Sequence, residues 1–159
     1  MNNWIWRTKE EKDQGFSLVE LLIVVIIMGI LAAIAIPLFM QQRAKAEDSA
    51  AKSDLRNLAN EVSTFWADSP TGSSIAITID AGKYKVVASP AGGTAETSTM
   101  AKSKNITAVN VTPGTGQTRE NWCVDITNPE GKKTSFALRA DDVIQEGVTC
   151  SGSGGGATT

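Results

Sequence analysis

Histidine is absent from this chain of 159 residues, and cysteine occurs only twice. The absence of histidine excludes Ser-His-Asp and Cys-His nucleophile arrangements and every metal site that needs a histidine ligand. Two cysteines are too few for a four-cysteine zinc site. No other nucleophile motif is present, so we expect neither an enzyme nor a bound cofactor.

Neither sign of charge is in excess. The sequence has 15 Lys and Arg residues against 17 Asp and Glu residues, which gives a formal net charge of −2. Because a surface that binds phosphate backbones is strongly basic, this balance argues against nucleic-acid binding as the main task. The length suits one domain with an added segment.

A long apolar block is present near the start. The twenty residues from Leu21 to Met40, LLIVVIIMGILAAIAIPLFM, include no charged, hydroxyl or amide side chain. A helix of about 20 apolar residues crosses the apolar core of a bilayer. The alternative is a buried core helix, but the rest of this short chain has too little apolar mass to surround one. We therefore interpret the block as a membrane-spanning helix.

The block does not have the flanks of an ordinary secretory signal, which is cut after its apolar region at small residues. Ala33 and Ala35 form a small pair, but Ile36 and Pro37 follow, and a proline just after a cut is a poor fit. We expect the block to remain in the working protein.

Glu20 stands directly before the block. A carboxylate at membrane depth is costly and persists where it has a partner or a function. Glu20 could mark the membrane interface, stabilised by the positive end of the helix dipole. Alternatively, it could pair with a specific cation. The residues alone leave both interpretations open.

The string from Gly15 to Leu22, GFSLVELL, resembles the processing motif of type IV prepilins, and the similarity continues through the apolar block. The resemblance implies that a membrane peptidase cuts between Gly15 and Phe16, and that Phe16 is then N-methylated. It also implies that Glu20 takes part in subunit addition. The amine of Phe16 would supply the missing cation, and we expect the pair to set the axial register of a filament.

Gly29 and Pro37 interrupt the apolar pattern. A proline inside a helix removes one backbone hydrogen bond and clashes with the preceding turn, which predicts a kink. The resemblance instead implies that the stretch between the two residues loses helicity in the assembled filament. We expect one of these two interruptions.

Beyond the block, Leu55, Leu58, Val62 and Phe65 recur at spacings of three and four, which predicts an amphipathic helix. One helix could thus run from about Phe16 to Ala67. Alternating apolar residues predict four or five strands, with residues 89–104 as an exposed loop. We expect an α+β fold, in which the long helix packs on an antiparallel sheet.

Cys123 and Cys150 are expected to form a disulfide in an exported domain, and the resemblance agrees; two free core cysteines are the alternative. The predicted parts of the chain are a cleaved leader at 1–15, a transmembrane and polymerisation helix at 16–42, an amphipathic helix at 43–67, a sheet head at 68–150 and a flexible Gly/Ser/Thr tail at 151–159.

The resemblance implies a structural subunit of a type IV pilus, first held in the cytoplasmic membrane and then at the cell surface. Its implied partners are other pilin subunits, the prepilin peptidase and the assembly machinery, with a host surface or DNA as a further ligand. The alternatives are a pseudopilin of a type II secretion or competence system, and a membrane-anchored minor or tip pilin.

Overall fold

The structure is a computed structural model that describes residues 15–112, 121–141 and 143–150. The expectations for the leader before residue 15 and for the tail at 151–159 lie outside these residues. The chain divides between Phe39 and Met40 into two compact units, which are described separately below.

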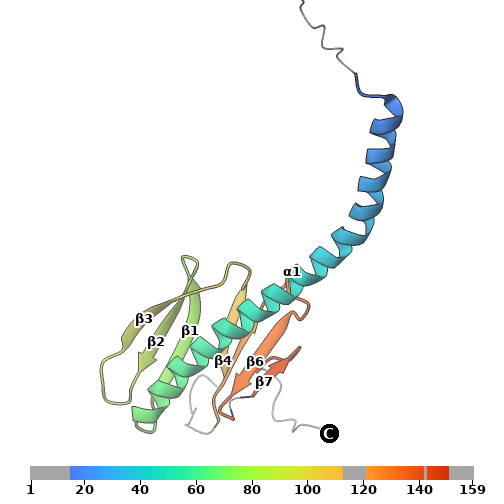
Figure 1. The fold of residues 1–159 in the computed structure, drawn as a ribbon. Coiled ribbons are helices and arrows are strands. Elements are labelled where there is room, and N and C mark those ends of the chain that lie inside the picture. The colour runs from blue at the N-terminus through green and yellow to red at the C-terminus, as the bar shows by residue number, and fades with distance from the viewer. Residues whose placement is uncertain (1–14, 113–120, 142, 151–159) are drawn as a thin grey trace, which may run out of the picture. The chain divides into compact units, whose positions relative to one another are not determined.

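The longest element is one helix, α1, from Leu18 to Asp68 (Figure 1). Its ends agree with the expected ends within two residues. Among residues 18–39, which belong to the first unit, every side chain is exposed. This helix is also long and apolar enough to cross a membrane, judged by length and composition. The large hydrophobic side chains of the first unit therefore stay exposed in the part of the chain that the structure describes.

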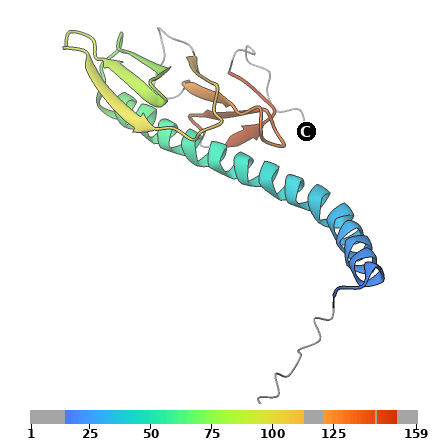
Figure 2. The same cartoon turned by 90° about the horizontal axis from the view of Figure 1, so that it is seen from above.

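In the second unit, α1 runs along one side of the strands (Figure 2). It buries one apolar stripe against them. Leu55, Leu58 and Val62 are fully buried, and Phe65 packs on the same core while half-buried. Their spacing of three and four residues places them on one side of the helix, as the sequence predicts. The opposite side of this part of α1 is polar and exposed.

Two antiparallel sheets cover the stripe, which confirms the α+β architecture. Sheet A has the order β1-β2-β3, and sheet B has the order β4-β5-β6-β7. The strand bounds are Ser74–Asp80, Lys83–Ser89 and Glu96–Ala101 for β1 to β3, then Ala108–Thr112, Cys123–Thr127, Ser135–Arg139 and Ile144–Glu146 for β4 to β7. Ala81 and Gly82, both with positive φ, form the two-residue turn between β1 and β2.

The predicted single sheet of four or five strands is wrong, because the described residues form seven strands in two sheets. Strand β3 lies inside the segment that the sequence predicts to be a loop. Five of its six side chains are exposed, so it lacks the alternation by which strands are recognised. It forms because the edge of β2 offers backbone partners, from Lys83 opposite Ala101 to Ala88 opposite Glu96.

Candidate functional site

The first turn of α1 is closed by a pair of side chains. The hydroxyl of Ser17 accepts a hydrogen bond from the backbone N–H of Val19 at 3.3 Å, and the carboxylate of Glu20 accepts one from the N–H of Ser17 at 3.2 Å. This exchange between a serine and a glutamate three residues later is a capping box, which satisfies N–H groups that the helix cannot pair itself.

The capping box gives Glu20 a role within a single copy of the chain. Its carboxylate lies at the positive end of the dipole of its own helix, where negative charge is favourable. The expected pairing between Glu20 and the amine of Phe16 in a neighbouring copy stays a prediction. The sequence analysis gives Ser17 no role of its own. The pattern Ser-x-x-Glu before an apolar run is the signal that identifies it as a helix cap.

Gly15 and Phe16 precede the helix and are both exposed, Phe16 by 82%. A Cβ atom built on Gly15 would have no atom within 4 Å. No contact among the described residues therefore requires a glycine here. The bond between Gly15 and Phe16 lies outside α1, in exposed chain without regular secondary structure, and its cleavage stays a prediction.

Gly29 and Pro37 both lie inside α1, which is assigned as helix throughout. A Cβ on Gly29 would also have no atom within 4 Å. An interruption that develops only in an assembled filament stays a prediction, because only one copy of the chain is described.

The expected disulfide between Cys123 and Cys150 is present, with the two Cα atoms 5.8 Å apart. The fully buried carboxylate of Asp125 lies beside it and accepts hydrogen bonds from the N–H of Cys150 and the side-chain amide of Asn110, each at 3.0 Å. The bond and Asp125 together fix the segment after β7 to sheet B.

A second buried carboxylate, that of Asp54, attaches α1 to sheet A and to the chain that follows β3. It accepts hydrogen bonds from the hydroxyl of Tyr84 at 2.9 Å and from the N–H and hydroxyl of Ser103 at 2.7 and 2.9 Å. The ammonium group of Lys102 donates to the backbone carbonyls of Ser103 and Ile106. Asp54 interrupts the apolar stripe of α1, which is the sequence signal for this network.

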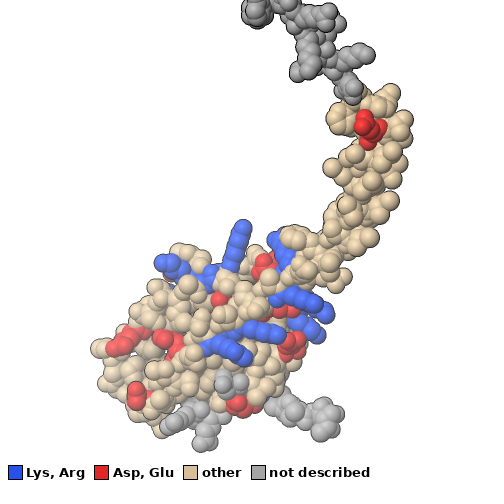
Figure 3. Space-filling view, in the orientation of Figure 1, with Lys and Arg blue, Asp and Glu red and all other residues tan. Residues whose placement is uncertain are grey.

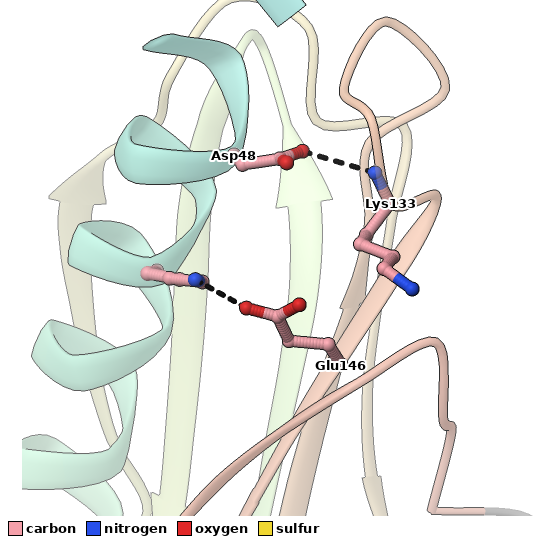
Figure 4. A network of polar contacts seen from close by, with 4 residues as sticks. Asp48, Lys133 and Glu146 are labelled. Carbon is pink, nitrogen blue, oxygen red and sulfur yellow. Dashed lines mark hydrogen bonds and ion pairs between the residues drawn. The ribbon is translucent and has the colours of Figure 1, made fainter. Parts of the chain in front are cut away.

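Polar contacts also join α1 to sheet B (Figure 4). The carboxylate of Asp48 accepts a hydrogen bond from the backbone N–H of Lys133 at 3.1 Å, and Lys52 forms an ion pair with Glu146. Lys52 donates a hydrogen bond to the Glu146 carboxylate. This bond and the positive charge of Lys52 hold the pKa of the Glu146 carboxyl below its usual range. These contacts orient the head on α1, so the surface that the head presents is set by the helix.

The first part of the chain is similar in sequence to known proteins. The family described as the prokaryotic N-terminal methylation motif matches residues 12–36. The type IV major pilin protein PilA of Myxococcus xanthus (strain DK1622) is 46% identical over 57 residues, which is 36% of this chain and 26% of that protein. The fimbrial protein EcpB of Eikenella corrodens is 58% identical over 36 residues, 23% of each chain.

A different group of relatives is also similar. The type II secretion system core protein G of Vibrio cholerae serotype O1 (strain ATCC 39315 / El Tor Inaba N16961) is 33% identical over 82 residues, 52% of this chain and 53% of that protein. The chain thus spans between about a quarter and about half of the length of these three relatives. No solved structure matches the chain. The matches confirm the resemblance to type IV pilins.

Proposed function

We propose that this protein is a structural subunit of a type IV pilus and polymerises through the first part of α1. The observation that carries the proposal is the combination of the methylation motif at residues 12–36 with the apolar first part of α1, whose side chains at 18–39 are all exposed. Large hydrophobic surface of this kind needs a bilayer or neighbouring copies around it.

In this proposal, the peptidase removes the leader before Phe16 while the apolar segment lies in the cytoplasmic membrane. The assembly machinery, driven by a cytoplasmic ATPase, then transfers the subunit to the filament. Neighbouring helices replace lipid around the apolar side chains, so the transfer exchanges one apolar environment for another. The freed amine of Phe16 pairs with Glu20, and the low dielectric of the filament core strengthens that pair.

The filament would serve adhesion, twitching motility or DNA uptake at the cell surface. A host surface or DNA is the corresponding ligand. The proposal assigns no enzymatic activity, since the chain has no histidine and no nucleophile motif.

The alternative is a pseudopilin of a type II secretion or competence system. The similarity to core protein G, which covers about half of this chain, favours this alternative. A membrane-anchored minor or tip pilin is the third possibility, and it would use the head as a binding module.

The test uses material sheared from intact source cells and the membranes left behind. N-terminal sequencing and intact mass are measured in both fractions, with and without reductant. Abundant sheared chain that begins at N-methylated Phe16 and gains two hydrogens on reduction supports the pilus subunit. Processed chain found only in membranes favours the pseudopilin or the minor pilin. Chain that keeps its leader in cells with the peptidase contradicts all three.

A further inference from the structure

The exposed side of α1 in the second unit begins with positive charge. Arg43 and Lys45 are exposed, and no hydrogen bond or ion pair joins either side chain to another described residue. The nearby carboxylates of Glu47 and Asp48 are already engaged by Asn105 and by the backbone of Lys133. We refer to Arg43 and Lys45 as the basic helix start.

The same helix finishes with negative charge. Asp68, in the last turn, is exposed, and that turn has no basic residue. The unpaired carbonyls of a helix C-terminus add further negative charge there. Glu96, at the start of β3, is exposed and lines the same surface hollow as Asp68, together with Phe65. We refer to Asp68 and Glu96 as the acidic helix end.

Each charge group therefore lacks a partner among the described residues of its own chain. The lower left of the head in Figure 3 shows acidic side chains without basic ones, while basic side chains lie along the upper edge, in the middle and on the right of this face. Acidic groups at a helix C-terminus are unfavourable for the helix itself. A cation from outside would relieve this repulsion, and the ring of Phe65 adds a surface on which a cation can lie.

We propose that the basic helix start of one copy docks on the acidic helix end of a second copy of this chain. The inference rests on the proposed function, because it describes how the heads of neighbouring subunits meet once their apolar segments have polymerised. The two surfaces differ and carry opposite charge. The contact is thus head-to-tail, which is the kind that produces an open helical filament and not a closed dimer.

The second copy is favoured as the occupant by charge complementarity and by the course of the chain. Arg43 follows the apolar block after only two residues, so packing of the apolar segments brings the start of one head helix alongside a neighbouring helix. At 1.5 Å per residue, Arg43 and Asp68 lie about 38 Å apart along a straight helix axis. The contact therefore requires an axial shift of about that size between the two copies.

The first experiment reverses the charges in source cells that lack the wild-type gene. The variants are R43E/K45E, D68K/E96K and all four changes together. We expect each paired reversal to lower the amount of sheared filament at least fivefold, at equal membrane level and processing, and the fourfold variant to restore it to within twofold of wild type. The matched control, K83E/K104E, reverses two other exposed lysines and should assemble normally.

The outcomes separate this inference from the proposed function. If the wild-type chain is missing from the sheared fraction, the proposed function is wrong. If wild type assembles and neither reversal affects it, only the inference is wrong. If R43E/K45E lowers assembly and the fourfold variant does not restore it, the basic helix start acts on lipid headgroups and the docking contact is refuted.

A second measurement tests the same contact without charge reversal, in case the reversal variants do not accumulate in the membrane. The two native cysteines are joined, and the sequence has no others, so introduced cysteines are unique. With a short bifunctional thiol reagent, filaments of the double variant Q42C/A67C, which keeps all four charges, should give a ladder of cross-linked multimers, while Q42C and A67C alone should give none. Dimers from either single variant, or no ladder from the double variant, would overturn the proposed contact.

Discussion

The hydroxyl of Tyr84 donates a hydrogen bond to the carboxylate of Asp54 across 2.9 Å, and both side chains are buried where α1 meets sheet A. Burial, the negative charge of Asp54 and this hydrogen bond all raise the pKa of Tyr84 above its usual value, in that order of importance. The neutral hydroxyl is therefore the form that the folded head requires.

This arrangement predicts how the protein responds to alkali. In the unfolded chain Tyr84 loses its proton near pH 10, whereas in the folded head it keeps it. Stability should thus be unaffected below about pH 10 and should fall progressively as the pH rises above it. Because Tyr84 is the sole tyrosine, the tyrosinate absorbance of detergent-solubilised protein reports this group alone. We expect the absorbance to appear near pH 10 in denaturant and at clearly higher pH without it.

The Y84F variant is the control for this titration. It should show no tyrosinate absorbance at any pH and should lose stability less steeply above about pH 10. A native protein in which Tyr84 titrates at its ordinary pKa would contradict the buried hydrogen bond.

Removal of the disulfide should weaken the head. We expect C123S/C150S to lower the free energy of unfolding by about 3–4 kcal/mol, because the bond restricts the unfolded chain. Denaturant unfolding of the solubilised protein measures the change. The reduced wild-type protein should show a similar loss, since it differs from the variant only in two sulfur atoms, and an unchanged midpoint in both would refute the prediction.

Gly131 is predicted to have little room for a side chain. A Cβ atom at this position would lie 2.2 Å from Oδ1 of Asp48 and 2.9 Å from the backbone oxygen of Lys133. If Asp48 moves away, it loses its hydrogen bond to the N–H of Lys133. We expect G131A to destabilise the head by about 1–2 kcal/mol. In a D48A background the added cost should shrink, because part of the obstacle is gone.

The capping box allows the two interpretations of Glu20 to be separated. E20Q keeps an oxygen that can accept the hydrogen bond from the N–H of Ser17 but removes the charge. If the charge pairs with the amine of Phe16, E20Q should accumulate in the membrane yet appear at least fivefold less in sheared filaments. If Glu20 serves only as a cap, E20Q should assemble like wild type, and S17A should show the larger defect.

The sequence predicted the helix well because its signals are local. The apolar block and the spacing of Leu55, Leu58 and Val62 follow from helical geometry alone, and both agree with α1. The hairpin of β1 and β2 was also visible, since Ile75 and Ile77 alternate and Ala81-Gly82 supplies the turn. These patterns need no information about distant residues.

Contacts between distant residues could not be predicted in this way. Strand β3 is mostly polar and exposed, with Met100 as its one side chain packed against the core, and the free edge of β2 specifies it. The network of Asp54, Tyr84 and Ser103 joins three segments whose proximity depends on the completed fold. Asp54 stands out as a charge within an apolar stripe, but nothing in the sequence identifies its partners.

The position of Cys150 determines when the disulfide can form relative to export of the head. Cys150 follows β7, so it comes after every strand that the structure describes. If the head is exported as the proposed function requires, its bond to Cys123 forms only after that whole stretch has left the compartment that keeps thiols reduced. The oxidised bond would thus indicate that translocation of the head is complete. The ratio of reduced to oxidised chain in pulse-labelled cells would then measure how long translocation takes.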